Sequence, residues 1–127
     1  METSKKSAAM ANKGSSLAHA ELVDAVLLRL GTLPVCRVWK NATGAVKTPT
    51  GFIKFGLKGS ADILGLTSDG KLLAIECKSG SAVLSKHQRM FQRMVTKMDG
   101  RYLLCRDADN IHKLIIGLNL PEVIWND

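Results

Sequence analysis

Two acidic residues and one lysine lie at the outer ends of two short apolar runs. Asp62 precedes the run Ile63 to Leu66, whereas Glu76 and Lys78 follow the run Leu72 to Ile75. Apolar runs of this length on either side of a turn signal indicate the two buried strands of a β-hairpin. The pairing of these strands decides whether the three ionisable side chains can act together.

The turn Ser68-Asp69-Gly70 sets that pairing. Read as a three-residue loop with its glycine in the left-handed conformation, it places Asp62 directly opposite Glu76, with both carboxylates on one face. A two-residue loop would instead pair Asp62 with Cys77 and turn the two acids to opposite faces. We favour the longer loop.

The longer loop predicts a metal site. Like charges on opposed strand positions repel, and a hard divalent cation would remove that repulsion. Carboxylate oxygens and backbone carbonyls suit Mg²⁺ or Mn²⁺, so the candidate ligands are Asp62, Glu76 and the backbone carbonyl of Cys77. Lys78 shares the face of Glu76 and could hold a nucleophilic water or stabilise charge on a phosphate. The alternative is a solvated strand edge with weak ion pairs.

The order of these motifs resembles a known nuclease family. The segments Gly59 to Asp62 (G-S-A-D), Ile75 to Gly80 (I-E-C-K-S-G) and Ser85 to Gln88 (S-K-H-Q) resemble the virus-type replication-repair nuclease (VRR-NUC) family of the PD-(D/E)XK superfamily. The similarity extends from about Ser16 to about Arg106. It implies Mg²⁺- or Mn²⁺-dependent hydrolysis of DNA, structure-selective on branched DNA such as Holliday junctions, and a phage or bacterial origin.

The resemblance also implies two assisting residues. The family carries a glutamate on the helix before its first strand, which corresponds here to Glu21. The alternative for Glu21 is an ordinary exposed glutamate. Gln88 corresponds to a family glutamine near the metal, but Ser85 and Gln88 also have the spacing of a helix capping box. Catalytic and structural roles therefore both remain open for Gln88.

Length and composition are those of one folded domain. The chain has 127 residues, 46% of them hydrophobic, and we expect a flexible basic tail at residues 1–15 followed by a single nuclease domain at 16–127. Eighteen Lys and Arg against eleven Asp and Glu give a net charge of +7, which favours an anionic partner such as DNA.

Cysteine usage and hydropathy indicate a cytoplasmic protein without a membrane partner. Cys36, Cys77 and Cys105 are odd in number and lack C-x-x-C spacing, so we expect reduced core residues. No apolar stretch reaches the length of a membrane span. The resemblance places the protein in a bacterial or phage-infected cell.

Apolar periodicity and capping residues predict an α/β fold, with a mixed central sheet flanked by helices. The expected helices are Ser16 to Leu30, Ser85 to Met98 and Ala108 to Leu118, and the expected strands are Pro34 to Lys40, Ile63 to Leu66, Leu72 to Ile75 and Arg101 to Arg106. This order matches the αβββαβ core that the resemblance implies.

Two basic segments are candidate DNA-binding surfaces. Asn41 to Ser60 is expected to be a long loop with a short extra strand around Ile53 to Leu57, and we assign it to a DNA groove. A basic row on the second helix would contact phosphates. The candidate residues are Lys47, Lys54 and Lys58 in the loop and Arg89, Arg93 and Lys97 on the helix. A plain connecting loop and a merely solvated helix face are the alternatives, and a non-catalytic DNA-binding module is the competing function.

The first helix and the chain end predict a homodimer. Nearly every face of the helix Ser16 to Leu30 is apolar, and the tail carries Val123, Ile124 and Trp125. Such surfaces usually find a partner, and paired cuts in a four-way junction require two active sites. The alternative is that these residues pack on each other within one subunit.

Overall fold

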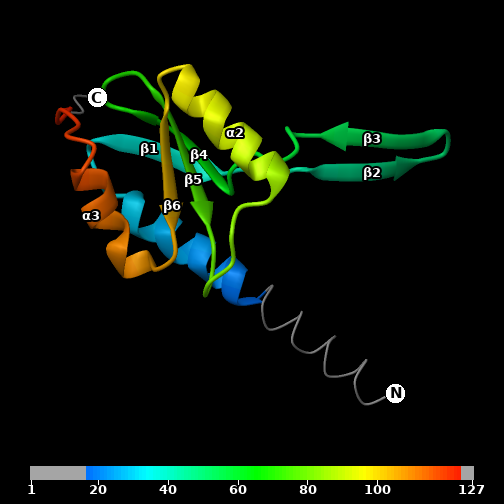
Figure 1. Ribbon diagram of the computed structural model, residues 1–127, viewed down its shortest axis with the longest axis horizontal. Helices are drawn as coiled ribbons and strands as arrows, with labels where there is room; N and C mark the ends of the chain where they lie inside the picture. Colours follow the sequence, from blue (N-terminus) through cyan, green and yellow to red (C-terminus); the bar gives the residue numbers. More distant parts are fainter. Residues whose placement is uncertain (1–16, 124–127) are drawn as a thin grey trace, which may run out of the picture.

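A four-stranded mixed sheet forms the centre of the fold (Figure 1). Its strands are β1 (Cys36–Lys40), β4 (Ile63–Thr67), β5 (Leu72–Cys77) and β6 (Arg101–Cys105), in the order β1-β4-β5-β6. β1, β4 and β5 are antiparallel neighbours, whereas β6 runs parallel to β5. The predicted α/β class with a mixed sheet is thereby confirmed.

The computed structural model describes residues 17–123 of the chain. The expected basic tail at residues 1–15 and the apolar residues Ile124 and Trp125 lie outside the described residues. Within that range, none of the helices combines the length and the apolar character needed to cross a membrane.

Helices cover both faces of the sheet. One face packs against the helix at residues 17–30 and against α3 (Ile111–Ile116), and the other face packs against α2 (Lys86–Lys97). The larger core, on the first face, includes Val23, Val26, Leu30, Ile63, Leu73, Ile75, Cys77, Cys105, Ile111 and Ile115. The smaller core consists of Phe91 and Val95 of α2 with Ala61 and Ala74. Two apolar layers therefore hold the sheet rigidly between helices.

The β4–β5 hairpin has the predicted three-residue loop. The Thr67 N–H donates a 2.9 Å hydrogen bond to the Lys71 carbonyl, and Gly70 adopts a left-handed φ of 79°. The register pairs Ile63 with Ile75. Asp62, one residue before Ile63, therefore lies opposite Glu76, one residue after Ile75. The register prediction is confirmed.

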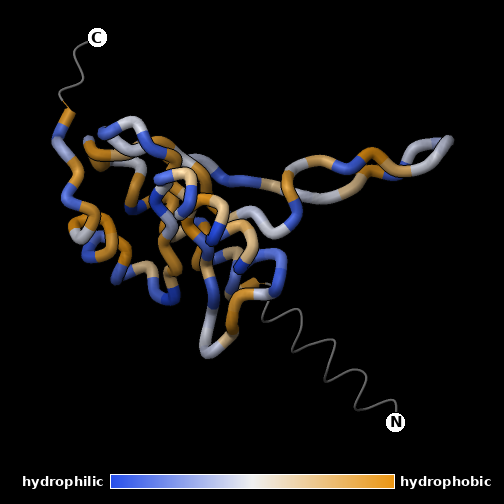
Figure 2. Tube along the Cα trace, turned by 45° about the horizontal axis from the view of Figure 1, so that its top comes forward, coloured by the Kyte–Doolittle hydropathy of each residue, from blue (hydrophilic) through white to orange (hydrophobic). Residues whose placement is uncertain are grey.

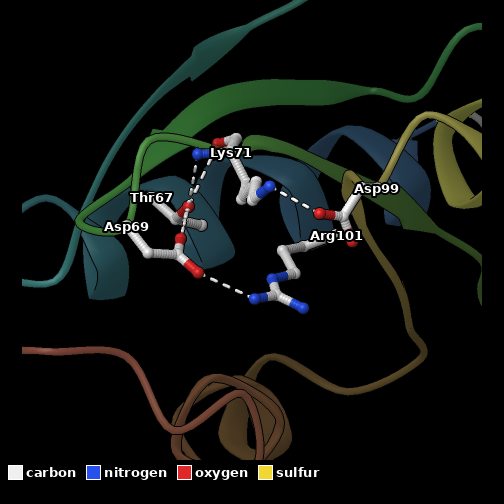
Figure 3. A network of polar contacts seen from close by, with 5 residues as sticks. All are labelled: Thr67, Asp69, Lys71, Asp99 and Arg101. Atoms are coloured by element: carbon white, nitrogen blue, oxygen red, sulfur yellow. Dashed lines mark hydrogen bonds and ion pairs between the residues drawn. The ribbon is translucent and has the colours of Figure 1, made fainter.

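A polar network ties this turn to the start of β6 (Figure 3). Lys71 Nζ lies 2.5 Å from Asp99 Oδ2, and Arg101 donates to Asp69 Oδ2 at 2.7 Å. The Thr67 hydroxyl donates to the other oxygen of Asp69. These contacts join the two turns at the end of the sheet that lies farthest from Glu76.

The segment Asn41 to Ser60, expected to be a loop with one short strand, contains a complete second hairpin. β2 (Gly44–Thr48) pairs antiparallel with β3 (Gly51–Phe55) as a separate two-stranded sheet. The hairpin projects from the body of the domain, and apolar and polar segments alternate along it (Figures 1 and 2). The expected short strand around Ile53 to Leu57 is present as β3, shifted towards Gly51. The rest of the loop prediction was wrong, because residues 44–48 form β2, which pairs with β3 and not with the central sheet.

Asn41 closes the neck of the projecting hairpin. Its side-chain amide donates to Ser60 Oγ at 2.7 Å and to the Ala61 carbonyl at 2.9 Å. Its backbone N–H donates to the Asp62 carbonyl at 2.8 Å. The chain therefore returns beside the point at which it left, directly before Asp62.

Other predicted boundaries differ in detail. The first strand begins at Cys36 and not at Pro34. The capping box of α2 is present at Ser85 as predicted. The last predicted helix is divided into a 3-10 turn, η1 (Ala108–Asn110), and α3. The predicted cap at Asp107 is present, since its side chain accepts the N–H of Asp109, and 3-10 turns are frequent at the starts of α-helices. The three predicted core cysteines are free and buried.

Candidate metal centre

Asp62 is held in place by the neighbouring strand. It directly precedes β4, and its Oδ2 accepts a 2.8 Å hydrogen bond from the backbone N–H of Cys77 in β5. This bond crosses the strand pair, so the carboxylate is directed at the end of β5. Gly59 positions the chain just before it: a Cβ at Gly59 would lie 2.4 Å from the His87 carbonyl oxygen, and only glycine permits that approach.

Glu76 is the one charged residue among the buried side chains of the described chain. Its exposed fraction is 2%, and its Oε2 has no hydrogen-bond partner among the described residues. Burial, followed by the adjacent Asp62 carboxylate, raises the pKa of Glu76 to about 8. A buried, unpartnered carboxylate oxygen is costly unless something neutralises it. A cation between the two acids would do so.

His19, which the sequence did not single out as a site residue, lies beside Asp62 in the structure. Its Nε2 lies 3.2 Å from Asp62 Oδ2. The candidate ligand atoms of His19, Asp62 and Glu76 all lie within 4.8 Å of one another. The signal in the sequence was a helical stripe, because His19 has the spacing to align with the buried residues Val23 and Val26.

Glu21, the helix residue assigned to the site by resemblance, lies on a different face of the same helix. Glu21 is exposed, as are Leu17, Asp24 and Leu28, which are spaced four, three and seven residues from it. A residue two positions after His19 points about 200° around the helix axis from it. The structure therefore places Glu21 on the solvent-facing stripe, away from the cluster that His19 joins.

Lys78 and Cys77 end the strand that carries Glu76. Lys78 is half-buried, and its positive charge acts on Glu76 in the direction opposite to burial, lowering the pKa of that carboxyl. The Lys78 N–H donates to the Cys105 carbonyl at 3.0 Å, which extends the β5–β6 pairing and fixes the backbone there. Burial raises the pKa of the Cys77 thiol to about 12, so that side chain stays neutral in the core and its backbone carbonyl remains the predicted ligand.

Gln88 contacts Glu76 from the first turn of α2. Its Nε2 lies 3.4 Å from Glu76 Oε1, while its Oε1 accepts the backbone N–H of Ser85 at 2.8 Å. The helix cap and the contact with the acidic site therefore occur together in one side chain.

Tyr102 is a further polar group on this face that sequence reasoning missed. It pairs with Ala74 in the sheet, packs against Phe91 and has a buried hydroxyl without a partner among the described residues. Burial, followed by the charge of Glu76, raises the pKa of the Tyr102 hydroxyl. The hydroxyl is therefore neutral and adds no negative charge to the site.

The predicted basic residues form two groups. Arg89, Arg93 and Lys97 line one shallow hollow on the exposed side of α2, as their spacing predicted. Lys47 and Lys54 lie on the same face of the β2–β3 hairpin, since Lys47 pairs with Phe52 and Lys54 with Ala45. Lys58 lines a hollow with His87 and Met94 of the α2 segment, between the two groups.

Comparisons with known proteins add nothing to this geometry. No protein-family model matches the chain, and a search of curated proteins found no relative.

Proposed function

We propose that this chain is a metal-dependent DNA endonuclease of the PD-(D/E)XK type, selective for branched DNA. The observation that carries the proposal is the position of Asp62 opposite the buried Glu76, which follows from the β4–β5 register. Glu76 Oε2 has no hydrogen-bond partner among the described residues, and Lys78 lies directly after the end of β5. Two carboxylates and a lysine at one strand end suit hydrolysis of a phosphodiester.

The donor set fits a hard divalent cation. Carboxylates of Asp62 and Glu76, with the Cys77 carbonyl, would hold Mg²⁺ or Mn²⁺. A cation held there would polarise a phosphate oxygen and lower the pKa of a coordinated water. The protein supplies the remaining steps: the Cys77 N–H and Gln88 orient the two carboxylates, and the Lys78 ammonium orients the attacking water and stabilises charge on the phosphate. The water oxygen bonds to phosphorus and releases one proton to solvent. The P–O bond to the leaving strand breaks, and the leaving oxygen takes up one proton from solvent, so the step balances.

Two basic surfaces support DNA as the substrate. The row on α2 begins at Arg89, one residue after Gln88, so a phosphate backbone along it would pass the acidic site. The projecting hairpin carries Lys47 and Lys54 away from the body of the domain. Separate basic surfaces of this kind can contact two duplex arms, which supports the preference for branched DNA.

We also propose that the enzyme acts as a homodimer. Leu17 and Leu28 of the first helix are 63% and 80% exposed, and two subunits would supply the paired cuts that resolve a junction. Light scattering at micromolar concentration tests this directly. A mass twice that of the 13.8 kDa chain supports the dimer, and a stable mass near 13.8 kDa contradicts it.

A cleavage assay on linear, three-way and four-way DNA tests the enzymatic function. With Mg²⁺ or Mn²⁺ the wild type should cut branched DNA, and Lys78→Ala should bind the same DNA but cut it at least about a hundredfold more slowly. Lys113→Ala, an exposed lysine on α3, is the matched control and should cut normally. Tight DNA binding by the wild type with no cleavage under any of these conditions would instead support the non-catalytic binding module.

A further inference from the structure

We propose that His19 is a third protein ligand of the candidate metal centre, and that its nitrogen makes the site prefer Mn²⁺ to Mg²⁺. The inference rests on the proposed metal site at Asp62 and Glu76, but it does not depend on DNA cleavage. His19 comes from the helix that covers the opposite face of the sheet, so it reaches Asp62 around the end of the sheet.

The separation of the ligand atoms suits a shared ion. Two ligand atoms about 2.1 Å from one ion lie about 3.0 to 3.4 Å apart when the angle between them is octahedral or tetrahedral. His19 Nε2 and Asp62 Oδ2 are 3.2 Å apart. All ligand atoms of the cluster lie within 4.8 Å of one another, and opposite positions of an octahedral site are about 4.2 Å apart. A shift of at most about 0.6 Å would therefore bring any pair to the separation that one ion requires.

The buried Glu76 oxygen is independent evidence that this cluster takes a ligand. Glu76 is 98% shielded from solvent, and its Oε2 is unpartnered among the described residues, on the same carboxyl group that completes the cluster. The His19 side chain is 40% exposed, so water and a phosphate oxygen have access from that side. The site thus combines protein ligands on one side with open positions on the other.

The ligand chemistry gives the metal preference. Mg²⁺ selects oxygen ligands and strict octahedral geometry, so two carboxylates and a carbonyl would serve Mg²⁺ and Mn²⁺ alike. An imidazole nitrogen adds affinity for first-row transition cations, which bind nitrogen better than Mg²⁺ does. His19 is therefore the residue that makes the site bind Mn²⁺ more tightly than Mg²⁺.

Titration calorimetry with each metal alone, on the full chain without DNA, tests the inference. His19→Gln keeps an amide that can donate to Asp62 but removes the imidazole ligand. It should weaken Mn²⁺ binding at least about tenfold while changing Mg²⁺ binding less than about threefold. His112→Gln, an exposed histidine on α3, is the matched control and should leave both affinities unchanged.

Spin-echo spectroscopy of bound Mn²⁺ supplies a second readout. The wild type should show coupling to an imidazole nitrogen, and His19→Gln should lose it. An unchanged ratio of Mn²⁺ to Mg²⁺ affinity in His19→Gln, or no nitrogen coupling in the wild type, would overturn the role of His19 while leaving the proposed nuclease intact. If the wild type binds neither Mn²⁺ nor Mg²⁺, the role of His19 and the proposed metal site at Asp62 and Glu76 are both overturned. Only that result would also contradict metal-dependent cleavage.

Discussion

Gln88 joins helix α2 to Glu76: its Nε2 lies 3.4 Å from Glu76 Oε1, and its Oε1 accepts the Ser85 N–H. The two roles that the sequence left open for Gln88 are therefore compatible. The cap orients the amide, and the oriented amide is within reach of the buried carboxyl.

Replacing Gln88 by two different residues separates these roles. Gln88→Ala should lower the free energy of unfolding by about 1 kcal/mol through loss of the cap. Gln88→Glu can keep the capping box, but it replaces the amide donor by a second acid beside Glu76. Its melting temperature without divalent cation should therefore fall and should recover when Mn²⁺ is added. A metal-free Gln88→Glu protein as stable as the wild type would contradict the contact.

The raised pKa of Glu76 predicts how stability depends on pH. The folded protein holds this proton up to about pH 8, whereas the ordinary pKa is 4.5. Between these values the folded state binds more protons than the unfolded state, so the metal-free protein should lose stability as pH rises through that window. Glu76→Gln should remove this dependence. Melting curves recorded with a chelator check the prediction, and a wild-type melting point that rises across the window would contradict it.

Divalent cation should stabilise the folded chain. A metal present at a hundred times its Kd adds about 2.7 kcal/mol to the free energy of unfolding when it binds only the folded state. Millimolar Mg²⁺ or Mn²⁺ should therefore raise the melting temperature, and Glu76→Gln should weaken or abolish the rise. Melting points unaffected by either cation would count against a preformed site.

The basic row on α2 predicts a specific salt dependence. Each phosphate contact contributes about 0.9 to the slope of log affinity against log salt concentration. Arg93→Ala and Lys97→Ala should each reduce that slope by about 1 and weaken binding to all DNA sequences equally. Fluorescence anisotropy over a salt series measures it, with Lys113→Ala as the control. An unaltered slope in both variants would show that this face is only solvated.

The polar network in Figure 3 should lose stability in acid, whereas protonation of Glu76 stabilises the metal-free fold. The Thr67 hydroxyl and then Arg101 lower the pKa of Asp69, and Lys71 lowers the pKa of Asp99. Their stabilisation is present above the ordinary pKa of 3.8 and is lost as pH falls through the lowered values. Asp99→Asn suits the left-handed φ of 64° but removes the charge, so it should lower the melting temperature slightly at neutral pH and not in strong acid or high salt. An equal loss under all three conditions would contradict the electrostatic origin.

Local rules were sufficient for the acidic pair. Gly70, which has a positive φ, indicated a three-residue loop. Counting back from that loop along the two alternating strands then gave the pairing of Asp62 with Glu76, in agreement with the register. The capping box at Ser85 followed from spacing in the same way. In each case the deciding residues lie within a single turn or a directly connected pair of strands.

The features that sequence reasoning missed depend on distant contacts or on exposed apolar side chains. His19 meets Asp62 across 43 positions of chain. The helical stripe aligns His19 with Val23 and Val26, but no local pattern indicates that this stripe ends beside Asp62. The β2–β3 hairpin leaves Val46 and Ile53 more than half exposed, so the usual link between alternation and burial does not hold there. Its turn between Thr48 and Gly51 also lacks the Asn-Gly or Asp-Gly signal of a two-residue hairpin loop.

The hydrogen bonds of Asn41 to Ser60, Ala61 and Asp62 lie at the boundary between the β2–β3 hairpin and the central sheet. We expect the hairpin and the central sheet to unfold as separate cooperative units. Because β1 and β4 are neighbours in the central sheet, the chain between them can lose its order without separating those strands. An isolated two-stranded hairpin is marginally stable, so the amide hydrogens of β2 and β3 should exchange with solvent through local opening, while those of β5 await global unfolding. We therefore expect the β2–β3 hairpin to open independently of the central sheet, so that Asp62, directly before β4, keeps its position when the hairpin opens.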